Sequence, residues 1–329
     1  MSAAGAPAPV VIAVDGGGSK TDAVLLSQDG HLLAHDRGPG SSPQTDGLES
    51  SVSTVDAVVS SVLGARGVGE LAQVNLYLSG LDFPAEISAY RAGIAPLDWA
   101  TDGTVVDNDL LALLRAGTDA PDAVAIVCGT GINAIGVRSD GATARFPAVG
   151  AISGDWGGGG TLGAEALWHA VRADDGRGPH TLLLEKVRDA FGVAYLSTAV
   201  EDLHFDRRSR SSVTALTPVV FAAASEGDAV AAELVQRQAD EIVAYARVCL
   251  TRLGLTDQEV PIVVGGGVAR ARHPLLVEGI RAGLADVAPQ ARLQIVDAAP
   301  ILGAGLLALA ASGASAEALA TARAELAGV

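Results

Sequence analysis

Two glycine-rich segments carry residue types that could bind an anion. Residues 15–21 read Asp-Gly-Gly-Gly-Ser-Lys-Thr, and residues 128–133 read Cys-Gly-Thr-Gly-Ile-Asn. Glycines let backbone N–H groups approach a ligand closely, and successive N–H groups in a turn form a concave anion site. The first segment lacks the GxxxxGK[ST] spacing of a P-loop. Each segment could hold phosphate, and each could also be a turn that only joins two strands.

Side chains in these two segments add specific chemistry. In the first, Ser19, Lys20 and Thr21 offer hydroxyl donors and a positive charge. Asp15 stands at the expected end of a strand, where its carboxylate could hold Mg²⁺ directly or through water. In the second, Thr130 can donate to a phosphate and Asn133 can reach a polar ligand.

An acidic segment at residues 106–109, Val-Asp-Asn-Asp, falls where a strand gives way to a helix. Asp and Asn are favoured helix caps. A carboxylate there could also be the general base that takes a proton from a hydroxyl during phosphoryl transfer. The two roles are compatible, because one of Asp107 and Asp109 could cap while the other points into a cleft.

Two further glycine clusters follow in the second half of the chain. Asp155 lies within residues 153–160, Ser-Gly-Asp-Trp-Gly-Gly-Gly-Gly, and its carboxylate suits hydrogen bonds to vicinal sugar hydroxyls. Trp156 could line a sugar cleft or belong to the core. Gly265, Gly266 and Gly267 follow an apolar segment, where a flat adenosine could pass the backbone or the chain could simply turn.

The segments that must position these residues repeat one order in both halves. Residues 10–14 and 123–127 are apolar, and each run precedes a glycine-rich turn, a second apolar run and an Asp-Gly turn. This order predicts strand, turn, strand, turn, strand in each half, and therefore a pseudo-symmetric molecule. Elsewhere the periodicity predicts helices over 48–62, 110–116, 163–172, 228–253 and 301–311, and strands over 74–78, 104–106 and 261–264.

Alternating strands and helices indicate the α/β class, in which ligands collect at the carboxyl ends of strands. The length of 329 residues is typical of about two domains. The turn-forming residues 117–122 mark the expected boundary. We expect a flexible tail at residues 1–9, one domain at 10–118 and a second at 119–329, whose last helix could pack back on the first.

Composition excludes several classes of protein. The net charge of −16 disfavours nucleic acid and anionic membranes as partners. The two cysteines, Cys128 and Cys249, cannot form a disulfide scaffold or a CxxC site, and the histidines lack zinc-site spacing. Cys128 is expected to be a small buried residue and not a nucleophile. Without a signal peptide or an apolar run of about 18 residues, the expected location is cytoplasmic.

Taken together, these segments resemble the superfamily of actin, heat-shock chaperone ATPases and sugar kinases. Within it they are most similar to N-acetylglucosamine kinases and BadF/BadG/BcrA/BcrD-type ATPases. The resemblance rests on an ordered series of motifs: DGGGSKT, LSG at 78–80, NDLLALLRAG at 108–117, CGTGIN, SGDWGGGGTLGAEAL, and VGGGV at 264–268. It implies two ribonuclease-H-like domains flanking an ATP and sugar cleft, and a family that often forms homodimers.

The resemblance also implies a role for individual residues. Asp109 is then the catalytic base, and Asp107 becomes the less favoured candidate. Residues matching the sugar site are Ser42, Ser79, Asp109, Thr130, Asn133 and Asp155. Residues matching the ATP site are Asp15, Gly16, Gly17, Lys20, Thr21, Gly129, Thr130, Gly131, Gly265, Gly266 and Gly267, with Asp15 also at Mg²⁺.

The predicted function is therefore an ATP-dependent amino-sugar kinase that acts on the 6-hydroxyl of N-acetyl-D-glucosamine. Two departures from the family pattern lie in the sugar site: residues 38–43 replace a frequent Ser-Thr-Asn context, and Trp156 replaces a frequent Glu. The acceptor could thus be glucosamine, a muramic-acid derivative or glucose. Functions of another class are an iron–sulfur ATPase activator, which needs cysteine ligands, and a nucleotide switch without sugar phosphorylation.

Overall fold

The chain folds into two compact units, and each contains one mixed β-sheet. The structure, a computed structural model, describes residues 9–329, so the expected tail lies outside the described residues except for Pro9. Unit 1 comprises the chain up to Asp119 together with Val296–Val329, and unit 2 comprises Ala120–Ile295. The change between units falls inside the predicted boundary at 117–122. The expected second domain, 119–329, ends in a helix that could pack back on the first domain, and in the structure the last 34 residues, Val296–Val329, belong to unit 1.

The sheet of unit 1 has the strand order β3-β2-β1-β4-β5. The first three strands are antiparallel neighbours, whereas β4 and β5 are added in parallel beside β1. The carboxyl ends of β1, β4 and β5, which carry polar residues, therefore lie at one edge of the sheet. The strands are β1 (Val10–Gly16), β2 (Thr21–Ser27), β3 (Leu32–Gly38), β4 (Leu71–Leu78) and β5 (Val105–Asn108).

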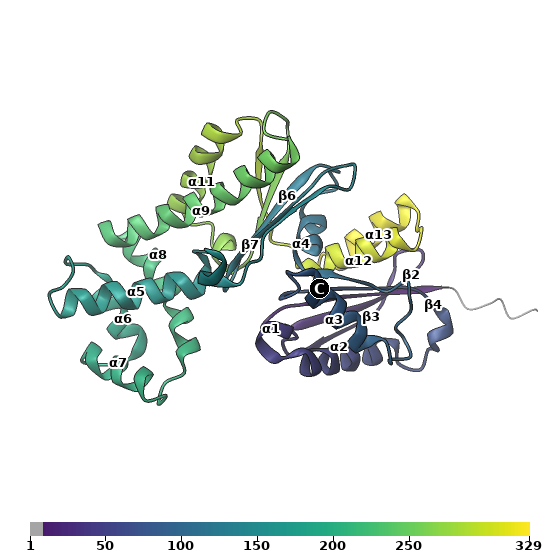
Figure 1. Cartoon of the computed structure of the whole chain (residues 1–329), viewed down its shortest axis with the longest axis horizontal. Coiled ribbons are helices and arrows are strands. Elements are labelled where there is room, and N and C mark those ends of the chain that lie inside the picture. Colours follow the sequence, from purple (N-terminus) through teal and green to yellow (C-terminus); the bar gives the residue numbers. More distant parts are fainter. Residues whose placement is uncertain (1–8) are drawn as a thin grey trace, which may run out of the picture. The chain divides into compact units, whose positions relative to one another are not determined.

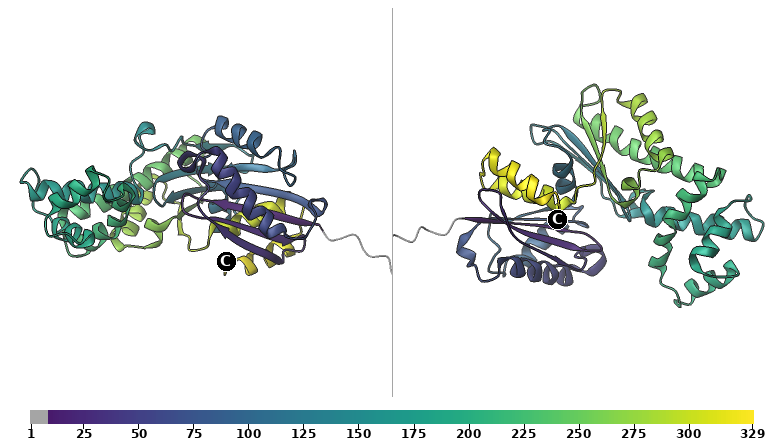
Figure 2. Two further views of the ribbon diagram at one scale, coloured as in Figure 1. Left: turned by 90° about the horizontal axis from the view of Figure 1, so that it is seen from below. Right: turned by 180° about the vertical axis from the view of Figure 1, so that it is seen from behind.

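Helices cover both faces of this sheet. One face forms a core with α2 and α3, and the other forms a core with α4, α12 and α13. In Figures 1 and 2 the yellow helices α12 and α13 lie beside the purple strands, so opposite ends of the chain share one core. The helices are α1 (Pro43–Asp46), α2 (Leu48–Leu63), α3 (Pro84–Ile94), α4 (Leu110–Gly117), α12 (Pro300–Ala311) and α13 (Ala316–Leu326), with a 3₁₀ turn at Val68–Glu70.

The sheet of unit 2 repeats the same topology, with the order β10-β9-β6-β7-β8. Here β6, β7 and β8 are the antiparallel strands, and β9 and β10 are added in parallel beside β6. The predicted repeat is thus confirmed, and it extends to five strands in each unit. The strands are β6 (Ala123–Cys128), β7 (Ile132–Val137), β8 (Thr143–Arg145), β9 (Pro261–Gly265) and β10 (Arg292–Ile295).

The helices of unit 2 pack into a single core with its sheet. The long helix α9 packs against β6, β7 and α11, while α5 packs against α6 and α8. Asp228 caps α9, because its side chain accepts a hydrogen bond from the Ala231 amide. The helices are α5 (Gly158–Asp174), α6 (Leu183–Phe191), α7 (Leu196–His204), α8 (Thr217–Ser225), α9 (Ala229–Leu253), α10 (Gly267–Arg270) and α11 (Pro274–Val287), with 3₁₀ turns at Gly150–Ser153 and Arg210–Leu216.

The C-terminal return of the chain has a clear physical cause. Helix α12 is apolar around nearly its whole circumference, and a helix of that kind must be buried on every side. Its backbone approaches α4 so closely that a Cβ at Gly303 would collide with the carbonyl of Ala112. Within residues 9–329, no helix combines the length and the apolar character needed to cross a membrane.

Candidate functional site

The first glycine-rich segment forms a tight hairpin between β1 and β2. The Gly17 amide donates to the carbonyl of Lys20 at 2.9 Å, and the Ser41 amide donates to the carbonyl of Gly17 at 3.0 Å. A Cβ at Gly40 would lie 2.6 Å from the carbonyl oxygen of Gly18. The loop after β3 therefore supports the hairpin from behind, and it needs glycine to do so.

The outer side of this hairpin is open. A Cβ built at Gly18 would meet no heavy atom within 4 Å, and Gly18 and Ser19 are exposed.

Thr21 behaves differently from the prediction for its side chain. It is fully buried, and its hydroxyl hydrogen-bonds to the Pro39 carbonyl and Ser41 Oγ, both at 2.7 Å. The Thr21 side chain therefore supports the hairpin instead of facing a ligand.

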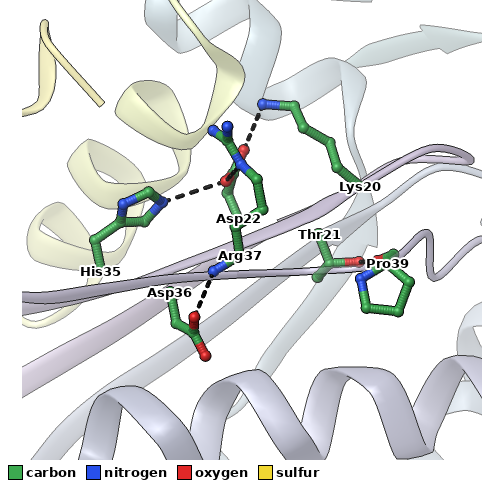
Figure 3. A network of polar contacts seen from close by, with 7 residues as sticks. All are labelled: Lys20, Thr21, Asp22, His35, Asp36, Arg37 and Pro39. Atoms are coloured by element: carbon green, nitrogen blue, oxygen red, sulfur yellow. Dashed lines mark hydrogen bonds and ion pairs between the residues drawn. The ribbon is translucent and has the colours of Figure 1, made fainter.

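Lys20 forms an ion pair that the sequence analysis did not predict. Its Nζ lies 2.6 Å from Oδ2 of Asp22, a carboxylate with no solvent exposure. Oδ1 of Asp22 accepts hydrogen bonds from Arg37 Nε at 2.5 Å and pairs with His35 Nε2 at 3.2 Å. Figure 3 shows the three side chains converging on this carboxylate. Burial by itself raises the Asp22 pKa, but the bonds from Arg37, Lys20 and His35 outweigh it and leave that pKa below the ordinary value.

Asp15, the second-last residue of β1, lies directly opposite Asp22 in the β1–β2 pair. It is 8% exposed, and no hydrogen bond or ion pair to its carboxylate is found among the described residues. Burial raises its pKa well above the ordinary value, and the charges of Asp109 and Asp22 add to this effect, while Lys20 lowers it. A buried carboxylate that lacks a direct donor is short of positive charge, which a bound cation would supply.

The acidic segment at the end of β5 does not cap its helix through either aspartate. The Leu110 amide at the start of α4 is bonded by Asn108 Oδ1 at 3.0 Å, and Asp109 makes no side-chain cap bond. Asp107 Oδ1 accepts the Asn108 amide at 2.7 Å. The Asp109 amide donates to the carbonyl of Leu78 at the end of β4, at 3.3 Å. Asp109 is thus fixed through its backbone, and its carboxylate remains available for chemistry.

The environment of Asp109 raises its pKa to about 7. Burial is the largest cause, and the charge of Asp82 is the next, while its own amide and that of Leu110 act in the opposite direction. A general base works best when its pKa lies near the operating pH. Asp109 therefore has the protonation behaviour that base catalysis requires.

Ser79 and Ser42 also lie in unit 1, near the ends of the strands. The Ser79 amide donates to the carbonyl of Gly16 at 2.8 Å, which places Ser79 next to the first hairpin. Its hydroxyl is buried without a hydrogen-bond partner among the described residues. Ser42 Oγ would lie 2.7 Å from a Cβ at Gly80. The structure thus brings Asp15, Lys20, Ser42, Ser79 and Asp109 to one edge of the unit 1 sheet.

The second hairpin, Gly129–Gly131, is held by the two other glycine clusters. The first amides of α5 donate into it, Gly159 to the carbonyl of Gly129 at 2.7 Å and Gly160 to that of Thr130 at 2.8 Å. A Cβ at Gly158 would lie 2.5 Å from the Gly131 backbone. A Cβ at Gly266 would collide with the carbonyl of Cys128.

These contacts explain Gly158, Gly159, Gly160 and Gly266 as close packing around the hairpin, whereas a Cβ at Gly267 would meet no atom within 4 Å. The Gly158 amide is also used internally, because it donates to Gln238 Oε1 at 2.8 Å. The N-terminus of α5 is therefore occupied by protein groups and is not an anion site. The hairpin itself stays open on its far side, since Thr130 and Gly131 are exposed and a Cβ at Gly131 would meet no atom within 4 Å.

A cavity of about 880 Å³ lies next to this hairpin, within unit 2. Asp155 lies in its wall, and both carboxylate oxygens are bonded: Tyr245 Oη donates to Oδ1 at 2.6 Å, and Ser153 Oγ and the Gly150 amide donate to Oδ2 at 2.5 and 3.0 Å. The residues that line the cavity are Thr130, Gly131, Ile132, Ala148, Gly150, Ala151, Asp155, Trp156, Gly157, Gly160, Thr161, Ala164, Glu165, Trp168, His169 and Arg237.

Trp156 takes part in both the core and the cavity wall. It packs partly against the core of unit 2, its Nε1 donates to Glu165 Oε1 at 3.2 Å, and Arg237 lies 4.1 Å from its ring centre. Asn133 lies on β7, where its Oδ1 accepts the Ala134 amide at 2.7 Å. Both Cys128 and Cys249 are fully buried in the unit 2 core, and burial raises the pKa of each thiol to about 12.

The sequence analysis did not single out several residues around these sites. Asp22, Asp82, Arg237, Gln238 and Tyr245 belong to none of the quoted motifs, and Glu165 lies within SGDWGGGGTLGAEAL without having been assigned a role. Tyr245 and Gln238 come from the middle of α9, far along the chain from the groups they contact. Only Asp22 lies close in sequence to one of the motifs, because it directly follows the first glycine-rich segment.

Comparison with known proteins identifies the family. The sequence profile of the BadF/BadG/BcrA/BcrD ATPase family matches residues 12–308. The chain therefore belongs to this family, whose members are two-domain α/β proteins with an actin-like ATPase fold.

Two curated relatives have similar lengths and named activities. N-acetyl-D-glucosamine kinase of Dictyostelium discoideum is 26% identical over 91% of this chain and 98% of the relative. N-acetylmuramic acid/N-acetylglucosamine kinase of Clostridium acetobutylicum is 26% identical over 78% of this chain and 85% of the relative.

Solved structures share the fold. A protein of Chromobacterium violaceum, provisionally assigned as an N-acetylglucosamine kinase, superposes with a TM-score of 0.70 at 24% identity, covering 91% of this chain and 99% of the other. A ROK family glucokinase of Streptomyces griseus, solved with glucose and AMPPNP, superposes with a TM-score of 0.59 at 17% identity, covering 91% and 99%.

Proposed function

We propose that this protein is an ATP-dependent amino-sugar kinase that phosphorylates the 6-hydroxyl of N-acetyl-D-glucosamine. The observation that carries the proposal is Asp109: a carboxylate with a pKa of about 7, not used as a helix cap, at the strand edge that also holds the first glycine hairpin. The names of the two curated relatives support the same reaction and acceptor class.

Each hairpin, within its own unit, would bind phosphate groups of ATP through its backbone. Gly18 and Gly131 have open space where a side chain would project, which is the space a phosphate needs to reach the amides. Lys20 would add a positive charge at the first hairpin, and Thr130 a hydroxyl donor at the second. Gly265–Gly267 would lie along the adenosine, since the Gly266 backbone packs against the second hairpin.

Asp109 would accept the proton of the sugar 6-hydroxyl as the phosphoryl group is transferred. Its fixed backbone would hold the carboxylate in one direction, and a pKa near neutrality would leave a large fraction ionised at physiological pH. Ser79, with its unpartnered buried hydroxyl, would hydrogen-bond to the acceptor and so gain the partner that it lacks.

The cavity of unit 2 carries polar groups that suit a sugar acceptor. Asp155 is oriented by three donors, and a carboxylate oxygen can accept a further hydrogen bond from a sugar hydroxyl. Thr130 and Asn133 on the hairpin side would complete the polar contacts. The carboxylate of Glu165, also in the wall, favours hydroxyl and amine donors on the sugar.

Mg²⁺ fits the donor set of unit 1. Mg²⁺ is usually held by one or two carboxylates together with waters and substrate phosphates, and the buried Asp15 carboxylate lacks any direct donor. No group of three or more potential metal ligands occurs within residues 9–329, in keeping with a metal that arrives with the nucleotide. When bound, the ion would neutralise charge on the transferring phosphoryl group.

The iron–sulfur activator has poor support from the cysteines. The chain contains two, and both are fully buried in the core of unit 2 with raised thiol pKa values. Neither thiol can reach a cluster shared between subunits without unfolding part of that core. The same family name therefore covers a different activity in this chain.

A coupled ADP-release assay tests the proposal with N-acetylglucosamine, glucosamine, N-acetylmannosamine, N-acetylmuramic acid and glucose as acceptors. We expect the highest kcat/KM with N-acetylglucosamine and formation of the 6-phosphate. A preference for another sugar would correct the acceptor and keep the kinase. ATP turnover that no sugar stimulates would contradict the kinase and favour a nucleotide switch.

A further inference from the structure

Asp22 has an unusual environment for a carboxylate in this chain. It is fully buried, yet three cationic or potentially cationic side chains contact it, although acidic residues outnumber basic ones by 38 to 22. The contacts are divided between its two oxygens. Arg37 and His35 from β3 take Oδ1, whereas Lys20 from the first hairpin takes Oδ2 (Figure 3).

This division makes Asp22 a rigid bridge between the edge strand and the hairpin. Asp22 and Arg37 are cross-strand partners in the β2–β3 pair, so the Arg37 bond is set by the sheet register. The bond from Arg37 therefore fixes the Asp22 carboxylate independently of Lys20. The Lys20 side chain is long and 41% exposed, and the ion pair with Asp22 holds its ammonium group in place.

The position of Lys20 matters because of what lies next to it. Its charge lowers the pKa of Asp15, so the ammonium group lies within electrostatic range of the open hairpin edge. Only two lysines occur in the chain, Lys20 and Lys186, and the other 20 basic residues are arginines. A compact ammonium group acts as a point charge toward phosphate, whereas an arginine would form a bidentate pair with Asp22.

We propose that Asp22 is a positioning residue that holds the Lys20 ammonium group at the first hairpin for ATP. The Arg37 charge offsets that of Asp22, so the charge of Lys20 remains available to a phosphate. The remaining N–H groups of Lys20 would donate to the nucleotide while one stays on Asp22 Oδ2. This inference rests on the assignment of the hairpin to ATP made above.

The test is a double-mutant cycle on the affinity for Mg²⁺–AMPPNP, measured by titration calorimetry on the full chain. Lys20→Met is expected to weaken binding by about 10- to 100-fold, the usual range for a hydrogen bond to a charged group. Asp22→Asn is expected to weaken it by about tenfold, even though removing a negative charge should by itself favour an anion. In the Lys20→Met background, Asp22→Asn should weaken binding no further.

The cycle separates the possible failures. Unchanged or tighter binding by Asp22→Asn alone would overturn the inference, and so would an equal loss with and without Lys20. Unchanged binding by Lys20→Met would also overturn the inference, because the Lys20 charge would then not act on the nucleotide. Normal nucleotide affinity of a Gly18→Ala variant would instead contradict the assignment of the hairpin to ATP.

If Asp22→Asn does not fold, Arg37→Met provides a second test of the inference. Arg37 lies on the edge strand and its side chain is 48% exposed, so its loss should be tolerated. We expect a smaller loss of affinity, about two- to fivefold, that disappears in the Lys20→Met background. Arg66→Met is the matched control, because it removes the same charge from an exposed pair with Glu70 in the same unit. An equal loss in both arginine variants would overturn the inference.

Discussion

The side-chain amide of Asn108 donates to Oδ1 of Asp82 at 2.9 Å, which holds an acidic group close to Asp109. The other end of the same side chain, Oδ1, caps helix α4. Asn108 therefore does two things for its neighbour. It replaces Asp109 as the cap, and it fixes the negative charge that, after burial, contributes most to the raised pKa of Asp109.

Asp109→Asn should reduce kcat by about 10²–10⁴-fold while leaving the affinity for AMPPNP nearly unchanged, because it removes a base without altering the hairpins. Steady-state kinetics together with calorimetry check both parts. Asp107→Asn is the matched control: Asp107 already accepts the Asn108 amide, so it should keep activity within about tenfold. The reverse pattern would make Asp107 the base.

The pH profile of kcat/KM should report the Asp109 pKa. The base is active when ionised, so activity should rise through about pH 7 and fall below it. Asp82→Asn removes a negative neighbour that raises this pKa, and the acid limb should therefore move to lower pH. Asp98→Asn, an exposed carboxylate change, should leave the limb in place. An unmoved limb in Asp82→Asn would show that Asp82 does not act on the base.

Asp109→Asn should also stabilise the protein at neutral pH. The folded-state pKa of Asp109 lies above the ordinary value of 3.8, so the folded state keeps a proton that the unfolded state has lost between about pH 4 and 7. Stability is therefore lost as the pH rises through that window. Thermal unfolding at pH 8 should show a higher Tm for the variant, by about 2–4 °C for each kcal/mol, and no difference at pH 4. A lower Tm at pH 8 would contradict the assigned environment.

Alanine at Gly18 or Gly131 should separate ligand binding from folding. Both positions have open space and neither has a positive φ, so the variants should keep the wild-type Tm within about 1 °C, whereas the added Cβ would enter the phosphate space and weaken AMPPNP binding. Gly158→Ala is the contrasting control. Its φ of +79° and its 2.5 Å approach to the Gly131 backbone predict a loss of stability. Normal nucleotide affinity in both open-site variants would exclude the hairpins as phosphate sites.

Tyr245→Phe should affect the sugar more than the nucleotide. The variant removes the 2.6 Å bond to Asp155 Oδ1 and leaves that carboxylate held through its Oδ2 donors alone. We expect the KM for the sugar to rise by about five- to tenfold, with the KM for ATP within about twofold. Tyr195→Phe, which alters an exposed tyrosine of the same unit, serves as the control. Equal changes in both KM values would indicate a structural role for Tyr245.

Local patterns were sufficient for the strands other than β10, for the hairpins and for the helices α2, α4, α9 and α12. Buried strands and amphipathic helices are dictated by side-chain periodicity, and glycine-rich turns by backbone freedom, so neighbouring residues carry the information. Helix α5 begins five residues earlier than predicted, at Gly158 instead of Gly163, because its glycine-rich first turn is stabilised by bonds to the second hairpin and to Gln238. No element was predicted for α6, α7 or α8.

The sequence by itself determined that this is a two-fold repeat of one α/β unit, with two glycine hairpins and an Asn-Asp pair at a strand end. The tertiary structure alone decided what those groups do. It gave the C-terminal helices to unit 1, because an apolar helix such as α12 must be buried on all sides, and it made the cap of α4 Asn108 and not an aspartate. It paired Lys20 with Asp22 and raised the pKa of Asp109, since burial and cross-strand neighbours depend on residues distant in sequence.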